Sequence, residues 1–249
     1  MVTGGGRGIG RSIALRYAHE GATVVVSSRT AGDLEAVVGS VESGGGRGVA
    51  VVADATDRDG ARRPVEAALE RFGRVDVLVN NVGGSVGRGH DPFTGDDESF
   101  ERTLVLSLTS AFWTSRAALP SMREHGWGAI INIGSGASKR STESTLGYTT
   151  AKHGLVGFTR QLASVSARHG ITVNCLCPGW TRTSLLDFEA VAARRGVSVE
   201  EAEARAVRDN LQRRILEPDE LTGMATLLAS AEGRGITGQV ISVDGGYGV

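Results

Sequence analysis

The stretch Thr3-Gly4-Gly5-Gly6-Arg7-Gly8-Ile9-Gly10 leads directly into an amphipathic helical pattern, Arg11–His19, and this junction decides the fold. Glycines at positions 4, 8 and 10 remove the side chains that would keep a ligand away from the backbone, and the free amides of the following helix stabilise negative charge. Because the spacing departs from the strict G-x-G-x-x-G fingerprint, an ordinary glycine-rich turn is the alternative interpretation. The junction favours a site for the pyrophosphate of a dinucleotide, lined by Gly4, Arg7, Gly8, Ile9 and Gly10.

Short runs rich in β-branched residues alternate along the chain with helical patterns of ten or more residues. We expect strands at Ala22–Ser27, Val49–Ala53, Val75–Asn80, Ala129–Ile133, Ile171–Leu176 and Gln239–Val243. Repeated βαβ units around a parallel sheet give this alternation. The sequence therefore predicts an α/β fold in one domain over residues 1–249, a doubly wound parallel sheet with helices on both faces and a helical lid over 183–214. Only Met1 and Val2 precede the glycine turn, so we expect either that the first strand is very short or that the start of the sequence is displaced.

Composition and charge exclude several classes of protein. The 249 residues include 27 Lys and Arg against 28 Asp and Glu, and the net charge of -1 argues against a nucleic-acid-binding protein, which needs a basic surplus. No apolar run approaches the roughly 18 residues of a membrane span, and the first residues do not resemble a signal peptide. Cys175 and Cys177 lie two apart in a strand-like run, so both point to one face and are poorly placed to bridge each other. We expect a cytoplasmic protein with no metal ion and no membrane partner.

The end of the predicted strand Ala22–Ser27 discriminates between cofactors. NAD-binding sites carry an acidic residue at this point, about 20 residues after the glycine turn, to bind the ribose hydroxyls. Here Ser28 takes that place, 18 positions after Gly10, and Arg29 follows it. A guanidinium can bond a 2′-phosphate bidentately and the strand end has no carboxylate to repel it, so we predict NADP(H), with NAD(H) as the alternative. An exposed loop arginine is the plainer interpretation, and Thr30 with Asp33 is expected to form the capping box of the next helix.

The run Gly147–Lys152 opens a helical pattern and places Tyr148 and Lys152 on one face, since residues four apart are neighbours on a helix. Only two of the 27 basic residues are lysines, so a lysine here indicates that a compact ammonium is needed. Such a charge beside a phenol favours the phenolate form, which suits a general acid or base. Ser135 follows the predicted strand Ala129–Ile133, at the edge where catalytic groups gather in open α/β sheets. A surface helical pair and an ordinary loop serine are the alternatives.

These elements together resemble the short-chain dehydrogenase/reductase family over essentially the whole chain. The matching elements are Thr3 to Gly10, Asn80-Asn81-Val82-Gly83, the set of Ser135, Tyr148 and Lys152 with 13 residues from serine to tyrosine, Pro178-Gly179-Trp180-Thr181-Arg182-Thr183, and Val243-Asp244-Gly245-Gly246. The resemblance implies a Rossmann fold, an NAD(P) cofactor and hydride transfer between the nicotinamide and a carbinol carbon.

The resemblance also implies a role for each site residue. Tyr148 would act as the general acid or base, Lys152 would bond the nicotinamide ribose and Ser135 would hold the substrate oxygen. The cofactor would further contact Asp54 and Ala55 at the adenine, Asn81 and Gly83 along the adenosine half, and Pro178, Gly179, Thr181 and Thr183 at the nicotinamide. One position departs from the family's pattern: Ser107 stands where members usually carry a catalytic asparagine that supports a proton-carrying water. A serine can also bond a water, so the resemblance assigns Ser107 to the same relay.

The substrate is less closely determined. The predicted lid offers apolar Leu185, Leu186 and Phe188 next to Trp180, and the opposite wall offers the polar candidates His90, Lys139 and Glu143. The chain is similar to polyketide and acyl-thioester ketoreductases and, through Asn-Asn-Val-Gly-Gly, to ring-diol dehydrogenases. We favour NADP(H)-dependent reduction of a ketone to a secondary alcohol. The alternatives are NAD-linked oxidation of an alcohol or ring cis-diol, and a non-catalytic dinucleotide-sensing or scaffold protein.

Two predicted helices, Phe100–Leu119 and Tyr148–Arg168, correspond to those that pair between subunits in the family. Their apolar side chains Phe112, Trp113, Phe158 and Leu162 predict a homotetramer or homodimer. Alternatively, these four side chains face their own sheet.

Overall fold

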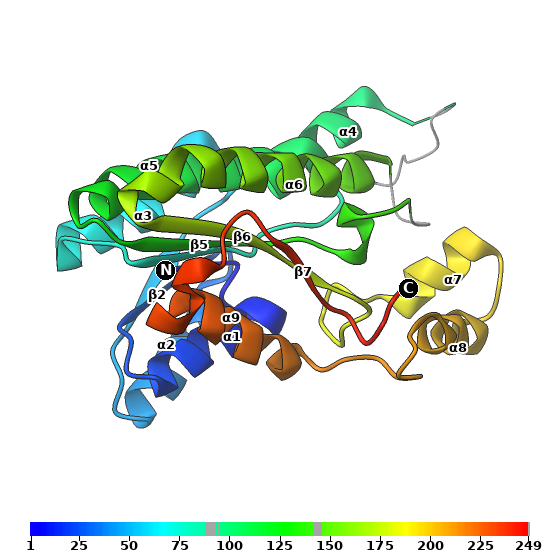
Figure 1. Ribbon diagram of the computed structural model, residues 1–249. Helices are drawn as coiled ribbons and strands as arrows, with labels where there is room; N and C mark the ends of the chain where they lie inside the picture. The colour runs from blue at the N-terminus through cyan, green and yellow to red at the C-terminus, as the bar shows by residue number, and fades with distance from the viewer. Residues whose placement is uncertain (88–92, 94, 142–145, 249) are drawn as a thin grey trace.

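A parallel sheet forms the centre of the structure, a computed structural model that describes residues 1–87, 93, 95–141 and 146–248 (Figure 1). Within these residues seven strands pair in the order β3-β2-β1-β4-β5-β6-β7. The strands are β1 (Val2–Thr3), β2 (Val24–Ser28), β3 (Gly48–Val52), β4 (Val77–Asn80), β5 (Gly128–Ile133), β6 (Ile171–Pro178) and β7 (Val240–Val243). The chain crosses back over the sheet after β3, so β1 and β4 are neighbours from which the sheet grows in opposite directions. Ligands of doubly wound folds bind outside the carboxyl ends of the strands at this point.

Helices cover both faces of the sheet (Figure 1). One layer contains α3, α4, α5 and α6, and the other contains α1, α2 and α9. The helices are α1 (Gly8–His19), α2 (Ala31–Ser43), α3 (Arg58–Phe72), α4 (Asp97–Leu104), α5 (Ser110–Glu124), α6 (Leu146–Ser166), α7 (Phe188–Arg195), α8 (Val199–Asp209) and α9 (Thr222–Ala229). Shorter helical segments are η1 (Val105–Thr109), η2 (Gly136–Ser138), η3 (Ala167–His169), η4 (Pro218–Leu221) and η5 (Ala231–Gly235).

The strands alternate their side chains between two separate cores. Val26 and Ile131 pack with Ile13 of α1 in the core beneath one face. Val25 and Ile130, each next to one of these in the chain, pack in the core beneath the other face. Successive residues of a strand point to opposite faces, and here both faces are covered. This double burial explains why the strands are apolar along their whole length.

The α/β fold with a doubly wound parallel sheet is confirmed. All six strands predicted from the sequence are present in the described part of the chain, with ends shifted by at most two residues. The first strand, β1, is very short and pairs through Val2 with both Val26 and Val79.

The segment predicted as a lid folds into α7 and α8, near the C-terminus in Figure 1. The two helices share a small core of Val191, Ala192 and Ala202, against which Trp180 and Phe188 pack. The helical character is as predicted, whereas the function of a lid over a substrate stays a prediction.

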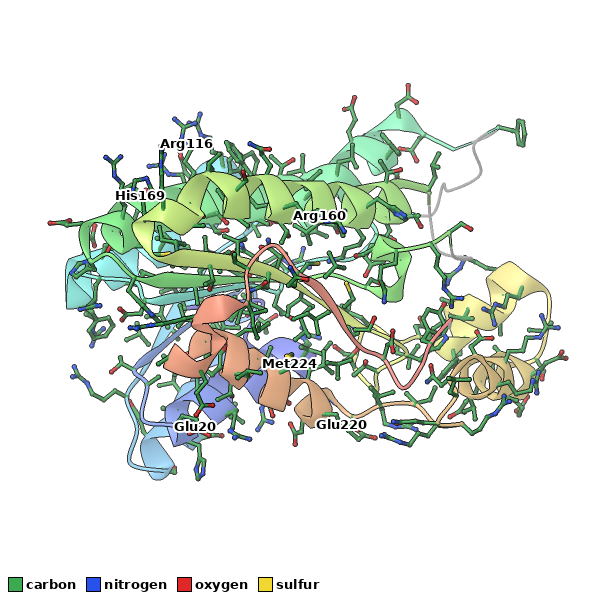
Figure 2. The ribbon with its side chains drawn as sticks, in the orientation of Figure 1. Glu20, Arg116, Arg160, His169, Glu220 and Met224 are labelled. Carbon is green, nitrogen blue, oxygen red and sulfur yellow. The ribbon has the colours of Figure 1, made fainter. Side chains whose placement is uncertain are left out.

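Charged side chains stand on the outer surfaces of both helix layers (Figure 2). Arg116 of α5 and Arg160 of α6 project from one layer, and Glu20 and Glu220 project from the other. In the described residues, none of the helices is both long and apolar enough to cross a membrane.

Candidate active site

The glycine turn between β1 and α1 is a cradle of bare backbone. Gly4 and Gly8 have φ angles of +60° and +54°, a left-handed conformation that residues with side chains rarely adopt. A Cβ at Gly10 would lie 2.5 Å from the carbonyl oxygen of Gly4, and one at Gly8 would lie 3.2 Å from Cγ2 of Thr183. The side chain of Ile9 is partly buried and packs against the core. The cradle is open because these positions are glycines, and the motif that ends at Thr183 borders it.

Asn81 ties the glycine turn to the end of β4. Its Nδ2 donates to the carbonyl oxygens of Thr3 and Gly4, at 3.0 Å each. Its backbone N–H donates to the hydroxyl of Thr3 at 2.9 Å. The predicted cofactor residue Asn81 therefore holds the shape of the cradle through its side chain.

The residues predicted to hold the adenosine end lie at the carboxyl ends of β2 and β3. Ala55 and Ser28 line one small hollow there, and Arg29 is exposed beside Ser28. Hydrogen bonds from the backbone N–H and hydroxyl of Thr56, at 2.9 and 2.8 Å, hold the pKa of Asp54 below its usual range, and the charge of Arg29 adds to the effect. Arg29 and Asp54 thus lie within electrostatic reach of each other at this end of the site.

Sequence reasoning missed a carboxylate at the same end. Thr30 makes no side-chain capping bond, so the predicted capping box with Asp33 is wrong. Asp33 instead forms an ion pair with Arg7, with 3.0 Å between Oδ2 and Nη2. A Cβ at Gly6 would lie 2.9 Å from Cβ of Asp33 and 3.2 Å from Oγ of Ser28. The strand end carries no acid, as the sequence shows, but the following helix supplies one beside it, and the inference that no carboxylate is present there needs correction.

Lys152 is buried in α6, and its ammonium is held by the strand beneath it. The residue is 2% exposed, and Nζ donates to the carbonyl oxygen of Ile133 at 2.7 Å. Nζ lies 5.6 Å from the centre of the Tyr148 ring. A Cβ at Gly83 would lie 2.9 Å from Nζ, so a glycine is needed here to leave room for the ammonium. The structure brings the predicted tyrosine and lysine onto one face of the helix and adds Gly83 to them.

Ser135 begins the helical turn η2, which packs against α6. Its Oγ accepts a hydrogen bond from the N–H of Ala137, and its N–H donates to Oγ of Ser138, at 3.1 Å each. Within the described residues these bonds leave the O–H of Ser135 without an acceptor. The hydroxyl can therefore donate to a substrate oxygen at the edge of the sheet where Tyr148 and Lys152 also lie.

Ser107 lies in η1, a π-helical turn between α4 and α5, and is 1% exposed. Its Oγ donates to the carbonyl oxygen of Gly84 at 2.7 Å and accepts from the N–H of Gly84 at 3.0 Å. Such π-helical turns are frequent at functional sites because they displace one turn of an otherwise regular helix. Ser107 fixes the loop that carries Gly83 against Lys152, and the relay through a water stays a prediction.

Two free cysteines lie beneath the Ser135 turn. Cys175 and Cys177 are fully buried on one face of β6, as predicted, with 3.8 Å between their sulfurs. Hydrogen bonds from the Cys175 thiol and from the N–H of Ser135 lower the pKa of Cys177, whereas sharing that proton and burial raise the pKa of Cys175. A Cβ at Gly134 would lie 2.7 Å from both sulfurs. The pair fills the space under the turn and contacts it.

The segment after β6 forms a tight turn against the C-terminal residues. β6 ends at Pro178, and a Cβ at Gly179 would lie 2.7 Å from the carbonyl oxygen of Asp244. The hydroxyl of Thr181 donates to the carbonyl oxygen of Gly179 at 3.0 Å. Because Cγ2 of Thr183 lies 3.2 Å from the position that a Gly8 Cβ would take, this turn borders the glycine cradle, as the predicted nicotinamide site requires.

An aromatic wall extends from this turn. The ring of Trp180 stacks on Phe188 and meets Tyr247 edge-to-face, with 6.2 Å between ring centres in each pair. The guanidinium of Arg140 lies 4.0 Å from the centre of the Tyr247 ring, and a Cβ at Gly136 would collide with that ring. The sequence identified Trp180 and Phe188, but not Tyr247, because only the fold brings the C-terminal segment over η2.

The other predicted substrate contacts are only partly described. His90 and Glu143 lie outside the described residues. The ammonium of Lys139 contacts the hydroxyl of Ser242 and lies 3.9 Å from Oδ2 of Asp244, so the C-terminal segment engages it. Leu185 is 76% exposed and leaves its apolar side chain for another partner.

The fold and these residues define a class of protein. The bare cradle at the start of α1 fits the pyrophosphate of a dinucleotide, because a side chain at any of its three glycines would meet backbone or side-chain atoms. A phenol and a buried ammonium on one helix face supply acid–base groups nearby. The class is that of dinucleotide-dependent oxidoreductases of the doubly wound type.

Comparisons with known proteins narrow this class. Residues 4–248 match the model of the family described as enoyl-(acyl carrier protein) reductase. The chain is 36% identical to the short-chain reductase NovJ of Streptomyces niveus, over 99% of this chain and 92% of that protein. It is 34% identical to 1,6-dihydroxycyclohexa-2,4-diene-1-carboxylate dehydrogenase of Acinetobacter baylyi, over 99% and 94% of the two chains. A solved variant of the actinorhodin polyketide ketoreductase with NADPH has a TM-score of 0.90 at 34% identity, covering 99% of this chain and 95% of that one.

The chain therefore belongs to the short-chain dehydrogenase/reductase family. It is an oxidoreductase that acts on alcohol or ketone groups with NAD(P) as its cofactor. The resemblance noted in the sequence is confirmed.

Proposed function

We propose that the chain is an NADP(H)-dependent reductase that converts a ketone to a secondary alcohol, with Ser135, Tyr148 and Lys152 as its catalytic residues. The observation that carries this proposal is the buried ammonium of Lys152, held at 2.7 Å by the carbonyl oxygen of Ile133 and 5.6 Å from the Tyr148 ring. Desolvating a charge that is buried at this depth is costly, so its presence indicates a functional role. The role we infer is to stabilise negative charge on the Tyr148 phenol.

Residues along the carboxyl edge of the sheet would hold the cofactor, which supplies the hydride when bound. Gly4, Gly8 and Gly10 with the start of α1 would bind the pyrophosphate. Arg29 and Ser28 would bind the 2′-phosphate, because a guanidinium and a hydroxyl are suitable donors to it. The remaining contacts would come from Asp54 and Ala55 at the adenine, from Asn81 and Gly83 along the adenosine half, and from Pro178, Gly179, Thr181 and Thr183 at the nicotinamide.

The chain's own residues would carry the proton. During reduction the hydroxyl of Tyr148 donates its proton to the carbonyl oxygen, and during oxidation it accepts that proton. The O–H of Ser135 donates a hydrogen bond to the same oxygen and fixes its position. The ammonium of Lys152 stabilises the charge that Tyr148 acquires, and Ser107 keeps this ammonium in place through the backbone of Gly84.

The substrate would lie against the aromatic wall of Trp180, Phe188 and Tyr247, under a lid formed by residues 183–214. This wall supports an apolar substrate body, and the exposed side chain of Leu185 would cover it. Ketone reduction is favoured over oxidation because Arg29 favours the phosphorylated cofactor. NAD-linked oxidation of an alcohol or ring cis-diol is the second candidate, supported by the likeness to the cyclohexadiene-diol dehydrogenase.

The assembly and location form a further part of the proposal. We expect a homodimer or homotetramer, because Phe112 of α5 is 41% exposed and its ring meets Phe158 of α6 edge-to-face. Leu162, by contrast, packs on the core of its own chain. The two free thiols suit a reducing compartment, so we place the protein in the cytoplasm.

The test is the variant Tyr148→Phe, assayed for NADPH oxidation against a panel of ketones. Losing the general acid should lower kcat by about 10²- to 10⁴-fold while the Kd for NADPH stays within about twofold. Tyr17→Phe is the matched control. The Tyr17 hydroxyl donates to the carbonyl oxygen of Ala225, and both residues lie in the helix layer on the other face of the sheet from Tyr148. Substantial residual turnover in Tyr148→Phe would contradict the catalytic role, and a wild-type chain that binds NADPH but reduces no ketone would favour the non-catalytic alternative.

A further inference from the structure

The acidic side chain of Asp33 lies at the cofactor-discriminating end of the site although it is outside the strand that normally supplies the acid. Asp33 is in the first turn of α2, five residues after Ser28. Cβ of Asp33 and Oγ of Ser28 lie on the same side of Gly6, at 2.9 and 3.2 Å from the position that a Gly6 Cβ would take. The glycine turn, the strand end and this carboxylate therefore meet at one corner.

One oxygen of this carboxylate is buried and lacks a hydrogen bond. Oδ2 of Asp33 has almost no exposed surface, and no donor in the described residues satisfies it. Nη2 of Arg7 is 3.0 Å away, close enough for an ion pair, but its N–H does not point at the oxygen. Because Oδ2 has almost no exposed surface, a ligand can reach this carboxylate only through its other oxygen, and the side chain as a whole is 34% exposed.

The charges around this corner partly cancel. Asp33 pairs with Arg7, whose side chain is 61% exposed. Arg29 acts on Asp54, and so does Arg102 from α4. A 2′-phosphate arriving here meets two carboxylates as well as the guanidinium groups, whereas a ribose hydroxyl meets a partly exposed carboxylate that can accept its hydrogen bond.

We propose that Asp33 determines how the chain discriminates between NADP(H) and NAD(H). Its carboxylate accepts a hydrogen bond from the ribose 2′-hydroxyl of NAD(H) and opposes the 2′-phosphate of NADP(H) by like charge. Arg29 favours the phosphate and Asp33 opposes it, so the chain binds both cofactors with a modest preference for NADP(H). This inference rests on the proposed function, because it concerns the cofactor of the same site.

The experiment measures the Kd for NADPH and for NADH by fluorescence titration, with no substrate present. Asp33→Asn keeps the shape of the side chain and removes its charge, and should bind NADPH about tenfold more tightly through lost repulsion. It should bind NADH about fivefold more weakly, because a neutral amide is a poorer acceptor than a carboxylate. Asp33→Ser is a second neutral variant and suits the start of a helix. Glu35→Gln, on the exposed face of the same helix, removes the same charge two residues away and should change neither Kd.

Salt separates charge repulsion from altered packing. Like-charge repulsion at a partly exposed site is screened, so the NADPH gain in Asp33→Asn should shrink between low ionic strength and about 0.5 M salt. A gain that is independent of salt contradicts the electrostatic part of the inference.

The outcomes also separate this inference from the proposed function. Equal NADPH/NADH ratios in wild type, Asp33→Asn and Glu35→Gln overturn the role of Asp33 and leave the reductase proposal intact. A wild-type preference for NADH contradicts the proposed cofactor, yet the ratio in Asp33→Asn should still move toward NADPH from that starting value. A shift of the preference toward NADH in both Asp33→Asn and Asp33→Ser refutes the inference.

Discussion

Replacement of Ser107 by alanine tests whether this residue holds the catalytic lysine indirectly. The change removes one hydroxyl that donates to the carbonyl oxygen of Gly84 at 2.7 Å and accepts from its N–H at 3.0 Å. Because Ser107 is 1% exposed, water does not readily replace either bond. The backbone next to Gly83 then loses its fixed distance from Nζ of Lys152, which any Cβ at that glycine would approach to 2.9 Å.

The size of the effect follows from the two bonds. Each hydrogen bond of this kind contributes about 1 kcal/mol net, so the variant should lose about 2 kcal/mol of unfolding free energy. For a chain of this length that loss lowers Tm by about 4–8 °C. Displacing the loop beside the ammonium should also lower kcat by about 10- to 100-fold, since small misplacements of catalytic groups have effects of this order.

Urea unfolding and NADPH-linked turnover measure the two effects separately. Ser166→Ala is the matched control, because Ser166 is 4% exposed and its hydroxyl donates only to the carbonyl oxygen of Leu162 in its own helix, at 2.6 Å. We expect that control to lose under about 1 kcal/mol and to keep its kcat. If Ser107→Ala unfolds and turns over like Ser166→Ala, the reasoning that links Ser107 to Lys152 is refuted.

Two further predictions concern the ion pair between Arg214 and Glu220 and the packing of Gly134 against the two cysteines. The fork of Arg214, with both bonds at 2.5 Å, holds the pKa of Glu220 at about 2, below its unfolded value, so this pair contributes stability above about pH 4.5 that is lost as the pH falls toward 2. Glu220→Gln should therefore lower the unfolding free energy by about 0.5–1 kcal/mol at pH 7, and equal losses at pH 7 and pH 3 would contradict this assignment. Gly134→Ala places a Cβ 2.7 Å from both cysteine sulfurs and should cost about 1–3 kcal/mol while shifting Ser135 and lowering kcat. Gly39→Ala, which meets nothing within 4 Å in α2, should instead be neutral or stabilising, and similar behaviour of the two glycine variants would count against the packing argument.

Much of the fold was predictable because the signals are local. Runs of β-branched residues identify β2 to β7 because both faces of a parallel sheet are buried and the strands are apolar throughout. The first strand has no such signal, since two residues form no pattern, and it is recognisable only by its pairing with β2 and β4. The tyrosine and lysine were predictable because a helix repeats every 3.6 residues and fixes which residues share a face.

Contacts between distant segments were not predictable in the same way. Tyr247 is at the end of the chain, and nothing in its neighbourhood indicates that it covers η2. Asp33 satisfies the sequence pattern of a capping box, yet it pairs with Arg7 across the glycine turn. Sequence spacing predicts which residues near one another in the chain can interact, whereas a long-range ion pair depends on how α1 and α2 are placed on the sheet.

The sequence by itself determined the doubly wound α/β fold, the cradle of Gly4, Gly8 and Gly10, and the residues Ser135, Tyr148 and Lys152 as candidates. These follow from backbone sterics, hydrophobic periodicity and motif order, which act over a few residues. Tertiary structure alone decided that Ser107 binds the backbone of Gly84 and that an acid lies beside the end of β2. Such contacts join segments far apart in the chain, and only the packing of helices on a common sheet fixes their distances.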